Sequence, residues 1–455
     1  MIVLQQWRRR LKQDPRFARI LHGSLSGIAG RGFGLLVSLV TLPLTVRYLG
    51  KLEYGVWVTI STSVVMMSVL DLGIANTLTN FISEAYAEDD RNKAQEGFAT
   101  AFWLTVALTL TLAPACFFAW RLANWGSIFH LQDPVLLAQA KECVAISAAF
   151  FLFSLPLNLA NRVLGGYQQV HLSNYFAMSG SILGLIAILS VVALKGTLVH
   201  LTAAYCAVSL LGNLGLNLWL CLWQKPWIMP LPWKMRREIA RALFGQGSLF
   251  FILQLTGLIV FNSDNLVITH YLGAAEVTPY SVAWRLTGYA SLLQSLIVPS
   301  LWPAFTEAYR KRDLVWVRST YHSINRKSLT AVGIAAVVLA LAGRTVIRLW
   351  AGNLAVPSSG LLWLMAIFAF VISVTTNQSV VLTATGRLRL EAGVAVLAAI
   401  ANLYLSIHLV QRIGAEGVIL SSILSFLVVM YIPQAWEVRR VLSGRYMPDD
   451  PASIT

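Results

Sequence analysis

Apolar runs of about twenty residues recur along almost the whole chain, and they constrain its fold more than any other feature. A run of that length can cross a bilayer as an α-helix. Hydrophobic residues make up 57% of the 455 residues and charged residues only 12%, about half the charged share of soluble domains. The sequence therefore predicts an all-α polytopic membrane protein. About twelve transmembrane helices are expected, near residues 24–46, 55–80, 98–120, 142–162, 174–194, 198–222, 246–269, 278–303, 328–347, 359–383, 391–410 and 416–436.

Lysine and arginine are distributed unevenly over the segments between these spans. Segments on the side of the N-terminus hold 25 of them and segments on the opposite side hold 8, with two more inside spans. Short cytoplasmic loops are enriched in Lys and Arg, so we expect both termini to be cytoplasmic. The same distribution accounts for the net charge of +15 without a nucleic-acid partner.

The sequence offers no motif for metal, disulfide or ATP chemistry. The four cysteines lie in or beside apolar runs without a CxxC pair, and the seven histidines are scattered. Zinc sites and disulfide frameworks need regularly spaced residues, and a Walker A motif is absent from the sequence. We therefore expect no metal and no cofactor, which leaves coupling to H⁺ or Na⁺ as the open source of energy.

A charged turn is nearly repeated between two apolar runs: RYLGKLEYG at residues 47–55 returns as HYLGAAEVT at 270–278. At this offset of 223 residues, positions 47–87 give 11 identities in 41, where about three would be expected by chance. Gly50 and Gly273 stand where helices should end, and glycine adopts the required positive φ without steric penalty. Six spans per half predict two six-helix bundles related by a pseudo-two-fold axis along the membrane normal.

The duplication and the charge pattern together divide the chain into five segments. They are a basic cytoplasmic N-terminus (1–23), an N-terminal six-helix bundle (24–222), a cytoplasmic basic amphipathic linker (223–245), a C-terminal six-helix bundle (246–436) and a cytoplasmic tail (437–455).

Three stretches, RYLGKLEYGVW, DLGIANTLTNFISEA and NSDNLVITHYLG, resemble the polysaccharide flippases. These are the Wzx-type branch of the multidrug/oligosaccharidyl-lipid/polysaccharide exporter (MOP) superfamily. The resemblance implies a transporter of the bacterial plasma (inner) membrane that works by alternating access. It would move undecaprenyl-pyrophosphate-linked oligosaccharide from the inner to the outer leaflet for assembly of O-antigen or other surface polysaccharide. Its implied partners are that lipid-linked oligosaccharide, membrane lipids, and polysaccharide polymerase and chain-length proteins.

Four ionisable residues lie inside predicted spans: Arg31, Asp71, Asp264 and Arg285. A charge at the centre of a membrane helix costs about 2.5–3.5 kcal/mol, so each should meet water, protein or substrate. Similar depths allow the ion pairs Arg31–Asp71 and Asp264–Arg285. The family resemblance implies in addition that the two arginines bind pyrophosphate in a central cavity, with the aspartates orienting them or coupling transport to an ion. The two roles are compatible.

Amide side chains in other spans are further candidates. Their simplest role is interhelical hydrogen bonding, worth about 0.6 kcal/mol each, and contact with the glycan is the alternative. The candidate glycan contacts are Asn76, Asn158, Gln254, Asn262, Gln294 and Asn377.

Two other function classes compete with the flippase. A cation-coupled small-molecule or multidrug exporter would share the superfamily and its span count. An enzyme acting on lipid-linked sugars, such as a polymerase or ligase, would need a large outer loop. The largest outer segment here is 121–141, which is too short for such a loop, so we expect that the protein is not an enzyme.

Overall fold

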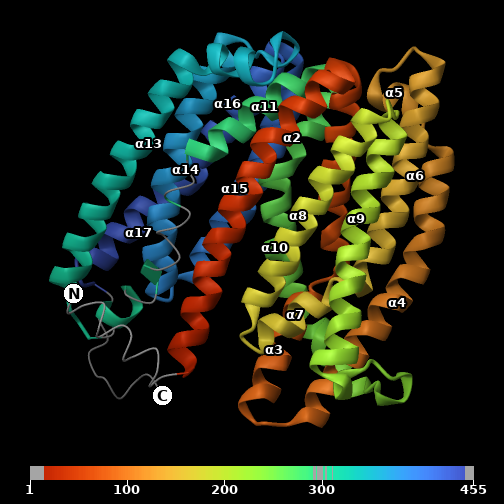
Figure 1. The fold of residues 1–455 in the computed structure, drawn as a ribbon. Helices are drawn as coiled ribbons and strands as arrows, with labels where there is room; N and C mark the ends of the chain where they lie inside the picture. Colours follow the sequence, from red (N-terminus) through yellow and green to blue (C-terminus); the bar gives the residue numbers. More distant parts are fainter. Residues whose placement is uncertain (1–14, 291–293, 295–300, 303–304, 310, 446–455) are drawn as a thin grey trace, which may run out of the picture. The chain divides into compact units, whose positions relative to one another are not determined.

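The computed structural model describes residues 15–290, 294, 301–302, 305–309 and 311–445, and the regular structure in these ranges is helical (Figure 1). In chain order the elements are α2 (Pro15–Met67), η1 (Ser68–Asp71), α3 (Ile74–Ala87), α4 (Arg91–Leu122), α5 (Trp125–Phe129), α6 (Pro134–Leu157), α7 (Leu159–Gly166), α8 (Val170–Ala193), α9 (Leu198–Trp219), η2 (Leu220–Gln224), η3 (Pro226–Ile228), η4 (Pro232–Lys234), α10 (Arg237–Leu272), α11 (Ala274–Ala290), α13 (Leu314–Trp350), η5 (Asn353–Ala355), α14 (Ser359–Ala384), α15 (Leu388–Ile413), α16 (Ala415–Ser425), η6 (Phe426–Tyr431) and α17 (Ile432–Leu442).

Nine helical stretches within the described ranges are long and apolar enough to cross a membrane. One of them, Ala29–Asp71, covers the first predicted span and most of the second, because α2 continues past a break at Gly50 (φ +74°). The seventh predicted span coincides with α10, and the eighth begins in α11 and runs into residues outside the described ranges. The other predicted spans fall on described helices, so the expectation of an all-helical, multi-pass membrane protein is confirmed.

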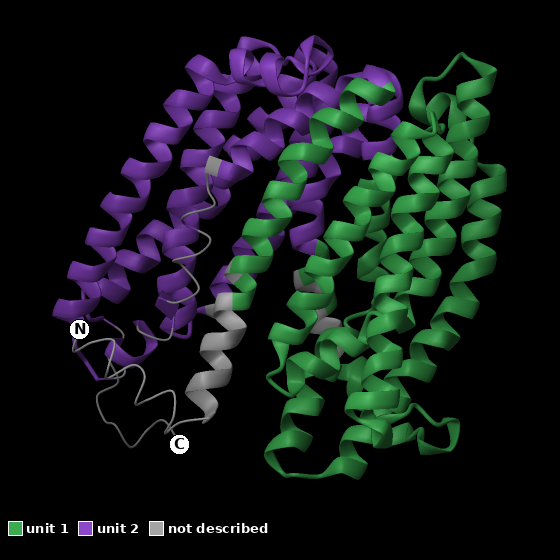
Figure 2. Ribbon diagram, in the orientation of Figure 1, with its two compact units in different colours: residues 1–49, 60–255 green, residues 50–59, 256–455 purple. Residues whose placement is uncertain are grey.

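The helices group into two compact units (Figure 2). Unit 1 comprises residues 1–49 and 60–255, and unit 2 comprises residues 50–59 and 256–455. The boundary between them falls inside α10 and therefore after the predicted linker 223–245. The break at Gly50 places the following ten residues, at the tip of the first hairpin, in the second unit.

The segment 223–245 does not form one separate amphipathic helix. Two short turns, η3 and η4, precede α10, which then runs into the seventh predicted span without interruption. The turns are held on α4: the Trp103 indole donates a hydrogen bond to the Pro230 carbonyl (3.0 Å), and Arg236 pairs with Glu96 (2.8 Å). Proline cannot donate a backbone hydrogen bond, which explains why Pro226, Pro230 and Pro232 keep this stretch out of a helix.

Each unit has its own apolar core. In unit 1, fully buried side chains from α3, α4, α7 and α9 pack together, among them Leu78, Phe98, Leu159 and Leu164. In unit 2, Phe305 and side chains of α13, α14 and α17 form a second cluster. Because lipid tails are as apolar as these side chains, close van der Waals packing holds membrane helices together in such cores.

Two repeat-related turns contact each other within unit 2. Gly55 packs on the backbone of Ala274, and the Thr278 hydroxyl donates to the Lys51 carbonyl (2.6 Å). Lys51 also pairs with Glu276 (2.7 Å). Positions 51 and 274 are equivalent at the 223-residue offset, as are 55 and 278, so the two contacts are reciprocal. Gly273 has a φ of +91° and Gly50 one of +74°, which confirms that both turns depend on glycine at this position.

Candidate functional site

The second predicted span is broken at Asp71. Helix α2 ends at Met67, and after the turn η1 the chain passes through Leu72 (φ +55°) and Gly73 (φ +75°) before α3 begins. The Asp71 carboxylate accepts a hydrogen bond from the Gly73 N–H at 2.9 Å. Glycine reaches this conformation easily, whereas a leucine with positive φ is uncommon. The hydrogen bond from the Gly73 N–H to the Asp71 carboxylate replaces one of the helical backbone hydrogen bonds that are lost at the break.

A second break lies at Asn158, where α6 ends and α7 begins. Pro156 lies in the last turn of α6 and restricts the backbone there. Asn217 of α9 donates its side-chain amide to the carbonyl of Leu157. That bond satisfies a backbone acceptor at the junction, which would otherwise be costly inside a bilayer.

Both breaks open onto one polar cavity within unit 1, with a volume of about 620 Å³. Irregular backbone at membrane depth is tolerated where it is buried in protein or lines a water-filled cavity. Its lining combines apolar side chains, such as Val64, Phe150 and Leu155, with hydroxyls, amides and one ion of each sign. The polar members are Ser68, Asp71, Thr79, Ser154, Asn158, Asn161, Arg162, Ser173, Ser209, Asn213 and Gln254.

Asp71 and Arg162 supply the charges of this cavity. The Asp71 side chain is buried and Arg162 on α7 is half-buried. Arg162 is near enough for its charge to act on the Asp71 carboxylate. The two do not form an ion pair within 4.0 Å among the described residues. The guanidinium therefore keeps donors that a ligand in the cavity can use.

Gln254 connects the cavity wall to the broken helix. Its amide nitrogen donates to the Ser68 carbonyl (3.3 Å), and its amide oxygen accepts from Asn76 (3.3 Å). Two of the predicted glycan contacts are thus bonded to each other. Gln254, Asn158 and Asp71 share one cavity, so the structure brings together three of the residues singled out from the sequence.

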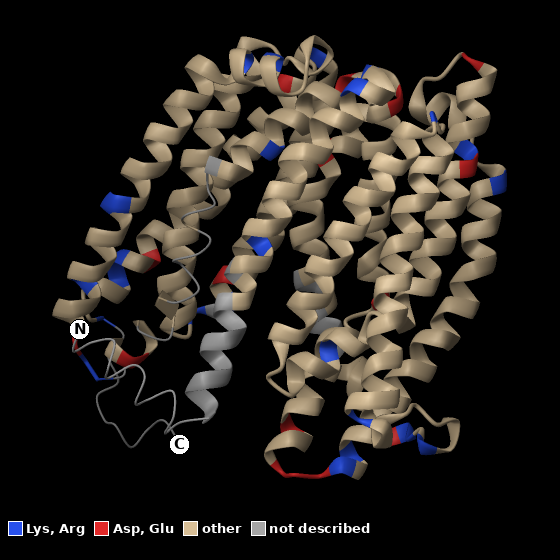
Figure 3. Ribbon diagram, in the orientation of Figure 1, with Lys and Arg blue, Asp and Glu red and all other residues tan. Residues whose placement is uncertain are grey.

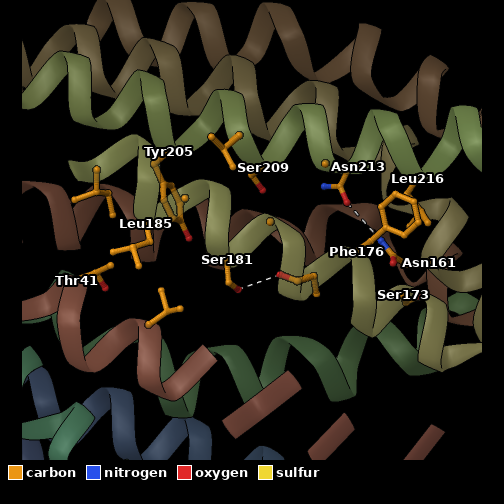
Figure 4. A pocket seen from close by; sticks show the side chains of 17 residues that line it. Thr41, Asn161, Ser173, Phe176, Ser181, Leu185, Tyr205, Ser209, Asn213 and Leu216 are labelled. Carbon is orange, nitrogen blue, oxygen red and sulfur yellow. Dashed lines mark hydrogen bonds between the residues drawn. The ribbon is translucent and has the colours of Figure 1, made fainter. Parts of the chain in front are cut away.

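A second cavity of about 370 Å³ adjoins the first (Figure 4). The two share Asn161, Ser173, Ser209 and Asn213 as lining residues. In Figure 4 the Asn161 and Asn213 amides face each other, joined by a 3.5 Å hydrogen bond. The rest of its lining combines the hydroxyls of Thr41, Ser181 and Tyr205 with apolar side chains, and it contains no charged residue.

The other predicted charges lie elsewhere. The Arg31 side chain is exposed on α2 in unit 1, and the Arg285 side chain is exposed on α11 in unit 2. Asp264 is buried on α10, where it accepts a hydrogen bond from the Tyr280 hydroxyl at 2.5 Å. Neither Arg31–Asp71 nor Asp264–Arg285 is among the ion pairs within 4.0 Å in the described part of the chain.

The predicted amides of unit 2 are mostly tied to one another. Gln294 donates to Asn377 (3.0 Å) and to the Ser373 carbonyl (2.8 Å), while Asn377 donates to Asn325 (2.9 Å). Both Gln294 and Asn377 are buried, and Asn262 is half-buried on α10. These contacts are the interhelical hydrogen bonds that were the simpler expectation.

Sequence reasoning missed Arg162 and Asn213 as parts of the site. Arg162 was assigned to an inner segment because it stands at the edge of an apolar run. The available signals were local: glycine directly after the Asp71-Leu72 pair, and proline two residues before Asn158. Within the described ranges there is also no group of three or more His, Cys, Asp or Glu suited to a metal ion.

The sequence is similar to proteins of one family. The family described as "Polysaccharide biosynthesis protein" matches residues 20–309. A Salmonella typhi protein named "Putative O-antigen transporter" is 24% identical over 304 residues, which cover 66% of this chain and 67% of that protein. A protein of the same name from Salmonella typhimurium LT2 is 23% identical over 282 residues, covering 61% and 63%. The matches thus span about two thirds of each relative.

Solved structures align with a larger share of this chain than the two Salmonella relatives do. An inward-facing multidrug resistance MATE family transporter of the MOP superfamily aligns with a TM-score of 0.76 at 15% identity, covering 91% of this chain and 96% of that one. A MOP superfamily transporter from Pyrococcus furiosus aligns with a TM-score of 0.63 at 15% identity, covering 93% and 96%. The fold is thus similar to that of solved MOP superfamily transporters, and the chain belongs to the polysaccharide biosynthesis protein family.

Proposed function

We propose that the chain is a flippase that moves an undecaprenyl-pyrophosphate-linked oligosaccharide across the plasma membrane by alternating access. The single observation that carries the proposal is the polar cavity at two broken helices, with Arg162 in its wall. Discontinuous membrane helices commonly form the substrate sites of transporters. The names of the two Salmonella relatives support the substrate class.

In this proposal Arg162 contacts the pyrophosphate. A guanidinium presents a planar fork of donors that matches phosphate oxygens, and the amides of Asn158, Asn161 and Asn213 can bond sugar hydroxyls. Asp71 stabilises the helix break by accepting the hydrogen bond from the Gly73 N–H, and its negative charge offsets that of Arg162 while the cavity is empty. The adjoining cavity, which has an uncharged lining that includes Tyr205, suits the faces of sugar rings.

Arg31 and Arg285 remain proposed as further phosphate contacts. Both side chains are exposed on membrane helices, and the planar guanidinium of an arginine matches phosphate oxygens. Asp264 is the proposed ion-coupling residue, since it is buried and its Oδ1 atom has no hydrogen-bond partner among the described residues.

The finer architecture is proposed with the function. Two six-helix bundles, 24–222 and 246–436, would be related by a pseudo-two-fold axis along the membrane normal, a proposal that rests on the 223-residue sequence repeat. Both termini would be cytoplasmic in a bacterial plasma membrane. Reporter fusions after residues 90, 235 and 320 should report the cytoplasm, and fusions after 130 and 353 the opposite side.

The decisive experiment measures transfer of fluorescent lipid-linked oligosaccharide between leaflets of proteoliposomes. Arg162→Ala should slow transfer about tenfold or more, because a charge-assisted bond to phosphate is lost. Arg162→Lys should recover part of the rate. Arg121→Ala, which removes an exposed arginine at the end of α4, is the matched control and should transport normally.

The rival small-molecule exporter is tested in the same vesicles. Efflux of a cationic dye that survives Arg162→Ala, together with undetectable transfer of the lipid-linked sugar by the unmodified protein, would replace the flippase with that rival.

A further inference from the structure

Three connections of unit 1 meet around a separate small cavity at one end of the unit. They are the α3–α4 turn, the α7–α8 turn and the segment that follows η2. The cavity has a volume of about 200 Å³ and is lined by Ala85, Tyr86, Asp89, Asp90, Arg91, Tyr167, Gln169, Lys225 and Trp227. Figure 3 shows basic and acidic residues gathered at this end of unit 1. The small cavity shares no lining residue with the polar cavity at the broken helices.

Two cations converge on the aromatic side chains of this cavity. The Lys225 ammonium lies 4.0 Å from the centre of the Tyr167 ring and 6.0 Å from that of Trp227. The Arg91 guanidinium lies 5.8 Å from the Trp227 ring. Burial, followed by the nearby charge of Arg91, holds the pKa of the Lys225 ammonium below its usual value. Two like charges are therefore held close together at one wall.

These cations lack a carboxylate partner at short range. Neither Arg91 nor Lys225 forms an ion pair within 4.0 Å in the described part of the chain. The nearby acids Glu84 and Glu88 instead pair with Lys93. A bound anion would relieve the repulsion between the two cations, as phosphate does in clusters of basic residues.

Two carboxylates line the same cavity. Asp90 accepts a hydrogen bond from the Lys93 backbone N–H (2.9 Å) as the N-cap of α4, and Asp89 is exposed. The cavity therefore presents two positive and two negative groups. A purely anionic ligand would meet the carboxylates unfavourably, whereas a ligand that carries both a phosphate and an ammonium would match both pairs.

The location of the cavity points to a lipid as the source of such a ligand. Trp223 and Trp233, on either side of Lys225 in the chain, are 72% and 71% exposed. Tryptophan is enriched at the level of lipid headgroups, and basic pockets at the cytoplasmic ends of membrane helices are known lipid-headgroup sites. The volume is below the roughly 300–1,000 Å³ of typical small-molecule sites, which suits a compact headgroup better than an oligosaccharide.

We propose that this cavity binds the headgroup of a zwitterionic phospholipid of the phosphatidylethanolamine class, with its phosphate between Arg91 and Lys225 and its ammonium at Asp89 and Asp90. The site is separate from the transport cavity. It would anchor the α3–α4 turn and the segment after η2 to the inner leaflet.

Native mass spectrometry of the purified full-length protein, titrated with phosphatidylethanolamine, phosphatidylglycerol or phosphatidylcholine, tests this proposal. One phosphatidylethanolamine should bind at least about tenfold more tightly to the unmodified protein than to the double variant R91Q/K225Q. The variant R91K/K225R keeps both charges and should retain the lipid. The control K234Q/R237Q removes two charges from the same part of the chain, outside the cavity, and should change binding less than about twofold.

Asp89→Asn tests the ammonium half of the site and should reduce the preference for phosphatidylethanolamine over phosphatidylglycerol. Equal retention of phosphatidylethanolamine by R91Q/K225Q and the unmodified protein would overturn the proposal. So would equal binding of phosphatidylglycerol and phosphatidylethanolamine by the unmodified protein. Displacement of the lipid by an equal concentration of free phosphoethanolamine would assign the cavity to a soluble ligand. Circular dichroism of each variant confirms that it is folded.

Discussion

Gly55 lies so close to Ala274 that a Cβ atom on Gly55 would stand 1.7 Å from the Ala274 carbonyl oxygen. The neighbour is backbone, which cannot move aside as the end of a flexible side chain could. The reciprocal bond from Thr278 to the Lys51 carbonyl fixes the same two turns from the other direction. Each contact joins positions whose equivalents at the 223-residue offset of the sequence repeat form the other contact.

We predict that Gly55→Ala destabilises the protein by about 1–3 kcal/mol, the range for overpacking a closely packed site. The measurement is the midpoint of thermal unfolding in detergent. Gly333→Ala is the matched control, because a Cβ there would meet no atom within 4 Å. That change should be neutral or slightly stabilising, since alanine favours helix over glycine. Equal midpoints for the two variants would show that the turns separate readily.

Asp71→Ala and Asp71→Asn should separate the two roles of Asp71. Alanine leaves the Gly73 N–H without its acceptor, at a cost of about 1–3 kcal/mol, so thermal stability and transport should both fall. Asparagine keeps an oxygen that can accept from Gly73 but removes the charge. It should restore most of the stability while transport stays low. If asparagine were as destabilising as alanine, the negative charge of Asp71, and not its hydrogen bond with Gly73, would be what stabilises the break.

The apolar runs predict the helices well because burial in lipid requires long uninterrupted apolar segments. They predict the breaks at Asp71 and Asn158 poorly. A window of about twenty residues averages over a two-residue interruption, so the second and fourth spans were expected to be continuous. The depth estimate that paired Arg31 with Asp71 assumed a rise of 1.5 Å per residue, which no longer holds once α2 ends at Met67. Arg162 escaped notice for a related reason, since α7 is a separate short helix.

The buried phenol of Tyr167 should give unfolding a distinct alkaline dependence. Burial raises the pKa of Tyr167 to about 12, against about 10 in an unfolded chain. Between these values the folded protein holds a proton that the unfolded chain releases, so the free energy of unfolding should fall as pH rises through this window. Tyr167→Phe should remove this part of the decline. An unchanged slope between pH 10 and 12 in that variant would contradict the assignment.

A double-mutant cycle distinguishes the two possible partners of Asp71. The structure places Asp71 and Arg162 in one cavity wall, with the charge of Arg162 acting on the carboxylate, whereas Arg31 is exposed on α2. Residues in one network couple by about 0.5–3 kcal/mol, and separate residues add within about 0.5 kcal/mol. The cycle Asp71→Asn with Arg162→Gln should therefore show coupling in both thermal stability and transport. The cycle Asp71→Asn with Arg31→Gln should be additive.

The transport activity of the double variant Asp71→Asn with Arg162→Gln separates an ion pair from a substrate site. If Asp71 and Arg162 act only as an ion pair, this double variant should regain transport, since no unpaired charge remains. A substrate site predicts that it stays inactive, because the phosphate has lost its donor. Recovery of transport in the first double variant would remove Arg162 from the binding site, and coupling only in the second cycle would restore the pairing expected from the sequence.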